Sequence, residues 1–431
     1  MTIDRRSVAD DLVSAAELDG LRARFDGELP AFLADLERLC SIDCGSYTPA
    51  GVNRVAAFVA AFLSGIGARV ERRPDPDGRY GDTVIATIDG RPGAGARLLL
   101  IGHMDTVFDE GTVTARPFRI DDGIARGPGV TDMKGGLLAG LYAVRAVAEA
   151  SRGRSGPADA ARPFERLVFV ANPDEEIGSP TSTPHIREIA ATSDACLVLE
   201  CARANGDFVS ARKGIVDLRV TIHGRAAHAG VEPEKGRNAI VAGANLVRGI
   251  QALNGRWPDV TANVGVFTSG TRPNVIPDRA ELQVDVRGMT RASLDGALAA
   301  VHEVVAAPGV PDVTTDVETM ASWMPMEKLE RSGRLVEHAI GLAARLGFAT
   351  KDTATGGASD ANTTSGMGVP SIDGLGPVGG LDHSPDEYLE VASIVPRTAL
   401  VAALLLAIGR DPVVADWRSA RAGGGPSGAA G

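Results

Sequence analysis

Three continuous apolar runs predict strands that are buried on both faces. They cover residues 96–101, 167–171 and 195–199. Helical periodicity precedes and separates them, at about 12–39, 52–62 and 137–150, and the Ser/Gly/Pro/Ala-rich stretch 151–163 predicts a loop. Strands that alternate with helices in this way are typical of an α/β domain with a mostly parallel sheet.

The region from about 214 to 322 follows a different pattern and predicts an inserted domain. Val216, Leu218, Val220 and Ile222 alternate with polar residues, as in a strand with one face in water. Further elements are expected at 240–250, 261–268, 281–287, 293–305 and 313–317, and their β-α-β-β-α-β order is that of a ferredoxin-like α+β fold. The α/β pattern then resumes with helices at 334–346 and 394–408. We therefore expect one domain made of 1–213 and 323–412, an inserted domain at 214–322, and a disordered tail at 413–431.

Charge and composition exclude several classes of partner. The 431 residues include 44 Lys+Arg and 55 Asp+Glu, for a net charge of −11, and no basic block is present, so nucleic acid and anionic membranes are not expected partners. The four cysteines form no C-x-x-C pair and are expected to be reduced core residues. No apolar segment follows the arginines at positions 5 and 6, and the apolar run 401–408 is shorter than the ~18 residues of a membrane span, so we expect a cytoplasmic protein.

Acids and histidines follow each of the three apolar strands. The carboxyl ends of parallel strands meet at one edge of the sheet, where ligands bind in such folds. Taken singly, each acidic or histidine motif is more often a capped loop or a solvated turn. Several carboxylates at one edge would repel one another unless a cation compensates them. The residues that we expect at this edge are His103, Asp105, Glu175, Glu176 and Glu200, joined by Asp132 and His383 from loops.

The donor types indicate which cation is expected. Two imidazoles with several carboxylates and no thiolate suit zinc, or cobalt or manganese in its place. Two ions bridged by a shared carboxylate, about 3.5 Å apart, would form a hydrolytic centre, with another carboxylate left free as general base.

The motifs HMDTV, ARGPGVTDMKGG, NPDEEIGS, VLE, GRAAHAG, RPNVIP and DHS resemble, in this order, those of a zinc-dependent metallopeptidase family. This family includes glucarpidase-type glutamate carboxypeptidases, aminoacylases and succinyl-diaminopimelate desuccinylase. The resemblance extends from about residue 32 to 408 and is greatest to the glutamate carboxypeptidase branch. It implies a catalytic domain with an inserted lid that serves as the dimerisation domain.

The resemblance also implies individual roles at the metal centre. His103 and Glu200 would bind one zinc, Glu176 and His383 the other, and Asp132 would bridge them, followed by a cis peptide bond to Met133. Glu175 would be the general base. Asp105, two residues beyond His103, would lie on the same side of the strand and orient its imidazole.

Five further positions match substrate-binding motifs of the family. His228 in the lid would stabilise the oxyanion in the partner protomer's active site, which would make the enzyme a homodimer. Asn274 and Arg287 would hold the substrate's carbonyl and carboxylate, although Arg287 could instead be a surface arginine paired with Asp285. Gly357 and Ser359 belong to a Gly-rich loop expected to face the substrate. The nearby His223 is expected to be a solvated histidine.

The sequence therefore predicts a dinuclear zinc hydrolase that cleaves an amide or peptide bond beside a free carboxylate. The favoured activity is a carboxypeptidase that releases a C-terminal amino acid such as glutamate. The alternative in the same class is an N-acyl-amino-acid deacylase. A more distant alternative is a relative that binds ligand without catalysis. However, all seven metal and catalytic positions hold the residue types that catalysis requires.

Overall fold

The structure is a computed structural model that describes residues 12–152 and 162–417. The chain forms two compact units. Unit 1 comprises Met1–Ser210, Lys328–Ala354 and Ser359–Gly431, and unit 2 comprises Ala211–Glu327 and Thr355–Ala358. The inserted domain expected at 214–322 thus corresponds to a slightly longer segment, and the four residues 355–358 join it from the second part of the chain.

Unit 1 is built on a six-stranded sheet in the order β1-β2-β6-β3-β7-β16. The pairs β6–β3, β3–β7 and β7–β16 are parallel, whereas β1–β2 and β2–β6 are antiparallel. The mostly parallel α/β sheet is therefore confirmed, and the two N-terminal strands form an antiparallel edge that the sequence pattern did not predict. The strands are β1 (Arg69–Arg73), β2 (Thr83–Asp89), β3 (Arg97–His103), β6 (Arg166–Asn172), β7 (Ala195–Val198) and β16 (Ser371–Ile372).

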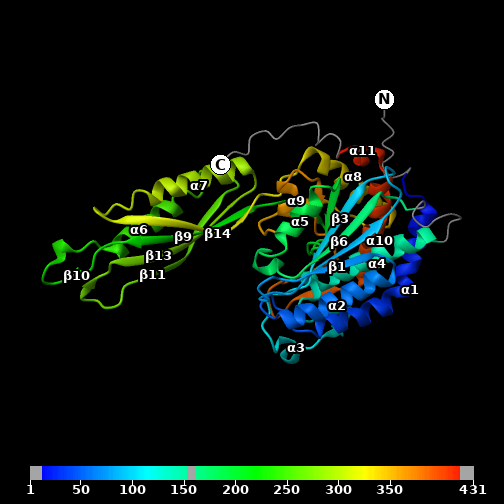
Figure 1. The fold of residues 1–431 in the computed structure, drawn as a ribbon, viewed down its shortest axis with the longest axis horizontal. Coiled ribbons are helices and arrows are strands. Elements are labelled where there is room, and N and C mark those ends of the chain that lie inside the picture. Colours follow the sequence, from blue (N-terminus) through cyan, green and yellow to red (C-terminus); the bar gives the residue numbers. More distant parts are fainter. Residues whose placement is uncertain (1–11, 153–161, 418–431) are drawn as a thin grey trace. The chain divides into compact units, whose positions relative to one another are not determined.

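Helices pack on both faces of this sheet (Figure 1). Leu98 and Leu100 of β3 belong to the large core cluster shared with α4 and α10, whereas Leu99 and Ile101 are buried on the opposite face. On that other side α9 packs against β7, β16 and α5. The helices of unit 1 are α1 (Ala15–Cys40), α2 (Pro49–Gly65), α3 (Thr112–Ala115), α4 (Gly135–Arg152), α5 (Thr183–Ala190), α8 (Glu330–Arg345), α9 (Asp360–Gly366), α10 (Val391–Arg410) and α11 (Pro412–Ala415).

Helix α10 is the one helix among the described residues that is long and apolar enough to cross a membrane. It has 20 residues with a hydropathy of 2.1, and 78% of its apolar window is buried inside the protein. It contacts α1, α4, α8 and β3. These contacts are those of a core helix, although the apolar segment is longer than the 401–408 run suggested.

The chain stays folded beyond the expected end of unit 1 at residue 412. Helix α11 continues from Pro412, and Val414 and Trp417 are buried. The rest of the predicted disordered tail, 418–431, lies outside the described residues, as does 153–161 of the predicted loop 151–163. The four cysteines are free and buried, as expected.

Short elements surround the carboxyl edge of the sheet. One four-stranded sheet has the order β17-β18-β5-β4, and β8 pairs with β15. These elements are β4 (Arg119–Asp121), β5 (Ile124–Arg126), β8 (Phe208–Arg212), β15 (Asp352–Thr355), β17 (Gly379–Gly380), β18 (Tyr388–Glu390), the π-helical turn η1 (Val130–Lys134) and the 3-10 turn η3 (Glu175–Ile177).

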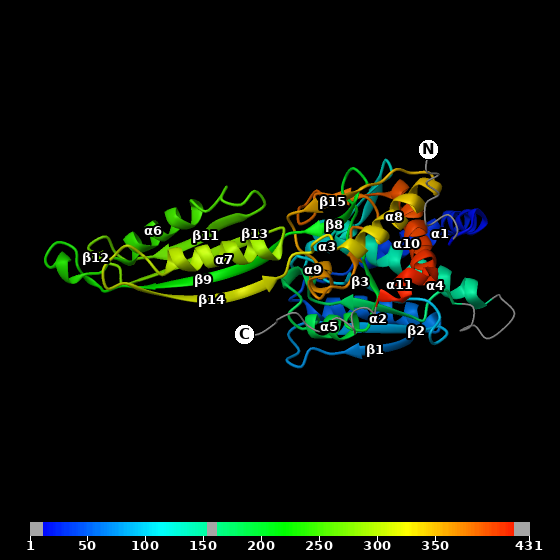
Figure 2. The same cartoon turned by 90° about the horizontal axis from the view of Figure 1, so that it is seen from above.

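Unit 2 has the ferredoxin-like architecture predicted for it. Its antiparallel sheet has the order β11-β13-β9-β14, and α6 and α7 lie side by side along one face (Figure 2). The apolar residues of β9 and β13 belong to a core cluster with both helices, so the alternation in the sequence is confirmed. The elements are β9 (Gly214–His223), β10 (Ala227–His228), η4 (Pro233–Lys235), α6 (Ala239–Gln251), β11 (Thr261–Ser269), β12 (Val275–Ile276), β13 (Arg279–Gly288), α7 (Arg291–Val305) and β14 (Thr314–Trp323).

Candidate metal centre

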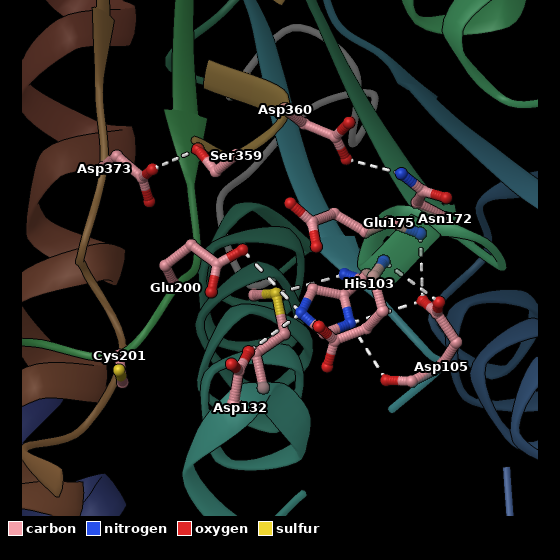
Figure 3. Close-up of polar contacts among 12 residues, drawn as sticks. His103, Asp105, Asp132, Asn172, Glu175, Glu200, Cys201, Ser359, Asp360 and Asp373 are labelled. Carbon is pink, nitrogen blue, oxygen red and sulfur yellow. Dashed lines mark hydrogen bonds and ion pairs between the residues drawn. The ribbon is translucent and has the colours of Figure 1, made fainter. Parts of the chain in front are cut away.

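The strands β3, β6 and β7 bring their carboxyl ends together at one edge of the sheet. His103 is the last residue of β3 and lies in register with Asn172, the last residue of β6. Glu175 therefore follows β6 close to His103, and Glu200 follows β7 on the other side of β3 (Figure 3). The acids and the histidine that follow these strands in the sequence do lie together, because parallel pairing aligns the strand ends.

Asp132 lies between two histidines. Its Oδ1 is 3.0 Å from His103 Nε2, and its Oδ2 is 3.2 Å from His383 Nε2. Each histidine also faces a second carboxylate: His103 Nε2 is 3.7 Å from Glu200 Oε1, and His383 Nε2 is 3.2 Å from Glu176 Oε2. One carboxylate thus connects two His–Glu pairs, which is the arrangement expected of a bridging ligand. The peptide bond after Asp132 is cis, as the resemblance implied.

The donor set fits divalent cations. The side-chain donor atoms of His103, Asp132 and Glu176, and those of His103, Glu175 and Glu200, lie within 4.8 Å of one another. Glu176 Oε1 is buried and has no hydrogen-bond partner within the described residues, so this carboxylate retains an unused lone pair. Imidazole nitrogens and carboxylate oxygens are donor types that suit zinc and other divalent metals.

The electrostatics show a surplus of negative charge. Burial raises the pKa of Glu175 well above its usual range, and the neighbouring Glu200 and Glu176 raise it further. Asp132 and Glu176 raise the pKa of His383 to about 10. Burial and the crowding of carboxylates together cause these shifts, and bound cations would offset the carboxylate charge.

Asp105 contacts several of the candidate metal-binding residues or their backbone. Its Oδ1 lies 3.4 Å from His103 Nδ1, so the Nε2 atom of that ring faces Asp132. The same carboxylate accepts hydrogen bonds from the backbone amides of Glu175 and Glu176, at 3.1 and 3.2 Å, and from Ser46 Oγ at 2.6 Å. Asp105 therefore fixes one histidine and the segment that carries two glutamates (Figure 3).

Glu387 is a buried site residue that the sequence reasoning missed. Its Oε1 accepts hydrogen bonds from the amides of Thr131 and Asp132, at 2.9 and 3.1 Å, and its Oε2 accepts one from Gly129 at 2.9 Å. Burial raises the pKa of Glu387 to about 7, although the three amides lower it. Glu387 lies four residues after His383, so it ties the loop of one histidine to the loop of the bridging carboxylate. Glu387 is the last residue of the motif DHSPDE, but the sequence does not indicate its hydrogen-bond partners, because they are backbone amides far away in the chain.

Ser359, in the Gly-rich loop expected to face the substrate, has a buried side chain. Ser359 is only 1% exposed, its hydroxyl donates to Asp373 at 2.6 Å, and it caps α9 (Figure 3). The structure therefore places the Ser359 side chain as a buried capping group, and the expected approach of this loop to the substrate stays a prediction. The adjacent Asp360 accepts hydrogen bonds from Asn172 and Ser179 in a buried polar cluster behind the strand ends.

Two lid residues come together within unit 2. His228 in β10 pairs with Val275 of β12, and the amide of Ala229 donates to the carbonyl of Asn274. The side chains of His228 and Asn274 are exposed. His223 is also partly exposed and lies 2.8 Å from Asp316, in agreement with a solvated histidine.

Arg287 is already engaged by an acid. Its Nε and Nη2 donate to Asp285 at 2.8 to 3.0 Å, and its Nη1 donates to the carbonyl of Gly356 at 3.0 Å. The next carbonyl, of Gly357, accepts from Arg212 at 3.1 Å. The structure thus contains the Asp285 pairing that the sequence left open as an alternative.

Comparison with known proteins identifies the family of this chain. The family model "Peptidase family M20/M25/M40" matches residues 99–407. Carboxypeptidase G2 from Pseudomonas sp. (strain RS-16) is 30% identical over 89% of this chain and 90% of its own length. Acetylornithine deacetylase from Proteus mirabilis is 26% identical over 88% of this chain and 97% of its own.

Solved structures show the same fold. An M20 family metallo-carboxypeptidase from Sulfolobus solfataricus aligns with a TM-score of 0.68 at 15% identity, over 88% of this chain and 99% of its own. Aminopeptidase PepT from Bacillus cereus aligns with a TM-score of 0.71 at 22% identity, over 88% and 98%. The family match covers most of the chain, includes the carboxyl ends of β3, β6 and β7, and implies a divalent metal. The protein is a C–N bond hydrolase and belongs to peptidase family M20/M25/M40.

Proposed function

We propose that the protein is a dinuclear zinc carboxypeptidase that cleaves an amide or peptide bond beside a free carboxylate and releases an amino acid such as glutamate. The main support is the position of Asp132, whose two oxygens lie 3.0 and 3.2 Å from the Nε2 atoms of two different histidines. His103 and Glu200 would hold one ion, and Glu176 and His383 the other. Bound ions would polarise the scissile carbonyl and lower the pKa of a water molecule.

Glu175 is the proposed general base. It is 8% exposed and lies beside the donor atoms of His103 and Glu200. Its carboxylate would take a proton from the attacking water and pass it to the leaving amine. A carboxyl whose pKa is raised by burial and neighbouring acids is suited to both transfers, because it can hold the proton between them.

One feature of unit 2, the guanidinium of Arg287, supports a substrate with a carboxylate. Arg287 uses three of its five N–H groups on Asp285 and Gly356, which leaves two for an incoming carboxylate. We propose that Asn274 and His228 contact the scissile carbonyl, with His228 acting across a homodimer. The name of carboxypeptidase G2 favours a carboxypeptidase, and that of acetylornithine deacetylase supports N-acyl-amino-acid deacylation as the second candidate.

Replacing Glu175 with glutamine tests the proposal. The Glu175→Gln variant should bind zinc with the wild-type stoichiometry while kcat for an N-acyl-glutamate falls by at least about a hundredfold, the lower end of general-base effects. Glu188→Gln, which alters an exposed acid of α5 paired with Arg73, is the matched control and should keep wild-type kcat. An unaltered kcat in Glu175→Gln would remove Glu175 from this role, and active protein without metal would refute the whole mechanism.

A further inference from the structure

Helix α10 contains a buried arginine, Arg397, that the mechanism above does not use. Arg397 is 1% exposed, and its guanidinium donates three hydrogen bonds to backbone carbonyls. Its Nε donates to Gly376 at 2.9 Å, its Nη1 donates to Gly206 at 3.2 Å, and its Nη2 donates to Gly374. No carboxylate in the described part of the chain forms an ion pair with Arg397. The hydrogen-bonded partners of this charge are therefore neutral backbone groups.

The charge of Arg397 makes its burial unfavourable. Burial lowers the pKa of its guanidinium to about 10, so the group still carries its charge at neutral pH. A buried cation without a paired anion costs free energy, whereas an apolar side chain does not. The neighbouring residues Leu400, Val401 and Leu404 of α10 are aliphatic and fully buried. The presence of an arginine among them therefore indicates that the carbonyls it binds are important to the protein.

Two of the three carbonyls belong to the β16 loop, residues 373–378, which follows strand β16. The amide of Gly376 donates to the carbonyl of Glu200 at 2.8 Å, and the amide of Ala202 donates to the carbonyl of Pro377 at 3.1 Å. This pair of hydrogen bonds ties the β16 loop to the backbone of Glu200, the candidate ligand that follows β7. Arg397 therefore holds the loop that holds this ligand.

The β16 loop approaches Glu200 too closely for a side chain at position 376. A Cβ on Gly376 would lie 2.9 Å from the carbonyl oxygens of Leu199 and Glu200, and 3.0 Å from Cα of Gly136. A shift of the loop would therefore displace the peptide group of Glu200. The carboxylate of Glu200 points toward His103, with Oε1 3.7 Å from Nε2 (Figure 3).

The third carbonyl belongs to the chain that continues from Glu200. The amide of Gly206 donates to the carbonyl of Arg203 at 2.7 Å, which closes a turn, and the carbonyl of Gly206 also accepts from Thr350 Oγ1 at 2.9 Å. Arg397 thus connects the β16 loop with this turn. A guanidinium can do so because its N–H groups point outward from three nitrogens in one plane, whereas a lysine donates from a single atom.

We propose that Arg397 is a positioning residue that fixes Glu200 at the metal centre and so sets the affinity for the ion held by His103 and Glu200. The proposal rests on the proposed function, which assigns Glu200 as a ligand of that ion. Loss of a group that orients a metal ligand weakens metal binding by roughly 10-fold to 100-fold. Loss of Arg397 should have an effect of this size on one of the two ions.

The ligands of the other proposed ion have separate supports. The amide of Glu176 donates to Asp105 at 3.2 Å. Glu387, four residues after His383, accepts a hydrogen bond from the amide of the bridging carboxylate's own residue at 3.1 Å. Neither contact includes the β16 loop. A positioning role of Arg397 therefore predicts the loss of one ion, whereas a general loss of stability would weaken both.

Zinc binding by the full chain tests the proposal without turnover. Equilibrium dialysis with elemental analysis should show two ions bound by wild type, and one of the two bound about tenfold or more weaker by Arg397→Met. Arg397→Lys keeps the charge but cannot span the three carbonyls, so it should show the same selective loss. The matched control is Arg410→Met, which changes another arginine of α10, paired with Glu17, and should keep both ions. Wild-type affinity for both ions in the two Arg397 variants would overturn the proposal.

Chemical rescue distinguishes positioning from misfolding. Arg397→Ala leaves a space with the shape of the missing group, so millimolar guanidinium should restore the weakened ion, whereas sodium at the same concentration should not. Recovery would support the positioning role, and no recovery would count against it.

Hydrogen exchange in the zinc-free protein separates this inference from the proposed function. The amide of Gly376 should exchange faster in Arg397→Lys than in wild type, while that of Glu176 should not change. If Gly376 responds but wild type binds fewer than two zinc ions, the proposed function fails and the hold of Arg397 on the backbone of Glu200 is supported. If wild type binds both ions and cleaves N-acyl-glutamates, and the Arg397 variants keep both ions, the positioning role is wrong and the proposed function stands.

Discussion

Replacing Glu387 with alanine should loosen the loop that presents Asp132. Three backbone amides, those of Gly129, Thr131 and Asp132, would lose a charged acceptor at 2.9 to 3.1 Å in a place where the side chain is 2% exposed. A buried donor left without a partner costs about 1–3 kcal/mol. The three together give about 3–9 kcal/mol, and water entering the vacated space should hold the loss near the lower limit.

This cost should appear in metal affinity, because the ordered loop is the form that binds. About 3 kcal/mol corresponds to a zinc affinity roughly a hundredfold weaker. Glu387→Gln should give an intermediate loss of roughly tenfold, because its carbonyl oxygen can still accept from two amides while its NH₂ group faces a third N–H.

Competition titration with a chromophoric chelator would measure the zinc affinity of each protein. Unfolding in chelator would show whether the apo variants remain folded. The matched control is Glu390→Ala, which removes an acid from the same segment, in β18, without touching these amides. Zinc affinity that is equal in wild type and Glu387→Ala would refute the reasoning.

Three further predictions follow from the structure. Chelation should lower the unfolding midpoint, since ligand at a thousand times its Kd contributes about 4 kcal/mol, and calorimetry with restored zinc would check this. Asp411→Asn should destabilise the protein by about 3–5 kcal/mol, because Asp411 is fully buried and accepts from Arg334 and His338. Burial raises the pKa of Asp411, but those two hydrogen bonds outweigh this effect, so the pKa is lowered overall. The stability that Asp411 contributes should therefore be present above about pH 4 and decline as the pH falls. Thermal unfolding at several pH values should show this decline for wild type and not for the variant. If His228 acts in the partner, mixing His228→Ala with Glu175→Gln protomers should restore partial activity, and no recovery would contradict the trans arrangement.

The apolar pattern predicted the central strands because burial on both faces leaves a simple signal. The runs at 96–101 and 167–171 became β3 and β6, and their alignment placed His103 beside the glutamates. Strand β1 gave no such signal: its sequence, RVERR, is largely exposed, and it is a strand because it pairs with β2 in the sheet. Tertiary pairing, which a local pattern does not contain, determines such strands.

Side-chain partners were harder to predict than backbone elements. Metal ligands are recognisable because their residue types are restricted and their loops follow strands. Glu387 and Ser359 bond to backbone amides and to Asp373, groups whose positions depend on loops far apart in the chain. The loop motif alone therefore did not indicate that the Ser359 side chain caps a helix.

Arg287 shows how the surroundings of a residue determine what it can bind. Asp285 occupies the side of the guanidinium formed by Nε and Nη2, and Gly356 takes one N–H of Nη1. A carboxylate that binds Arg287 would have to use the two remaining N–H groups, one on each Nη atom. Asp285 also reduces the net charge of the pair to zero, so the attraction for an anion is short-ranged and depends on hydrogen-bond geometry more than on field. In a protein of charge −11, such an arrangement favours ligands that present a carboxylate at the correct angle over anions in general.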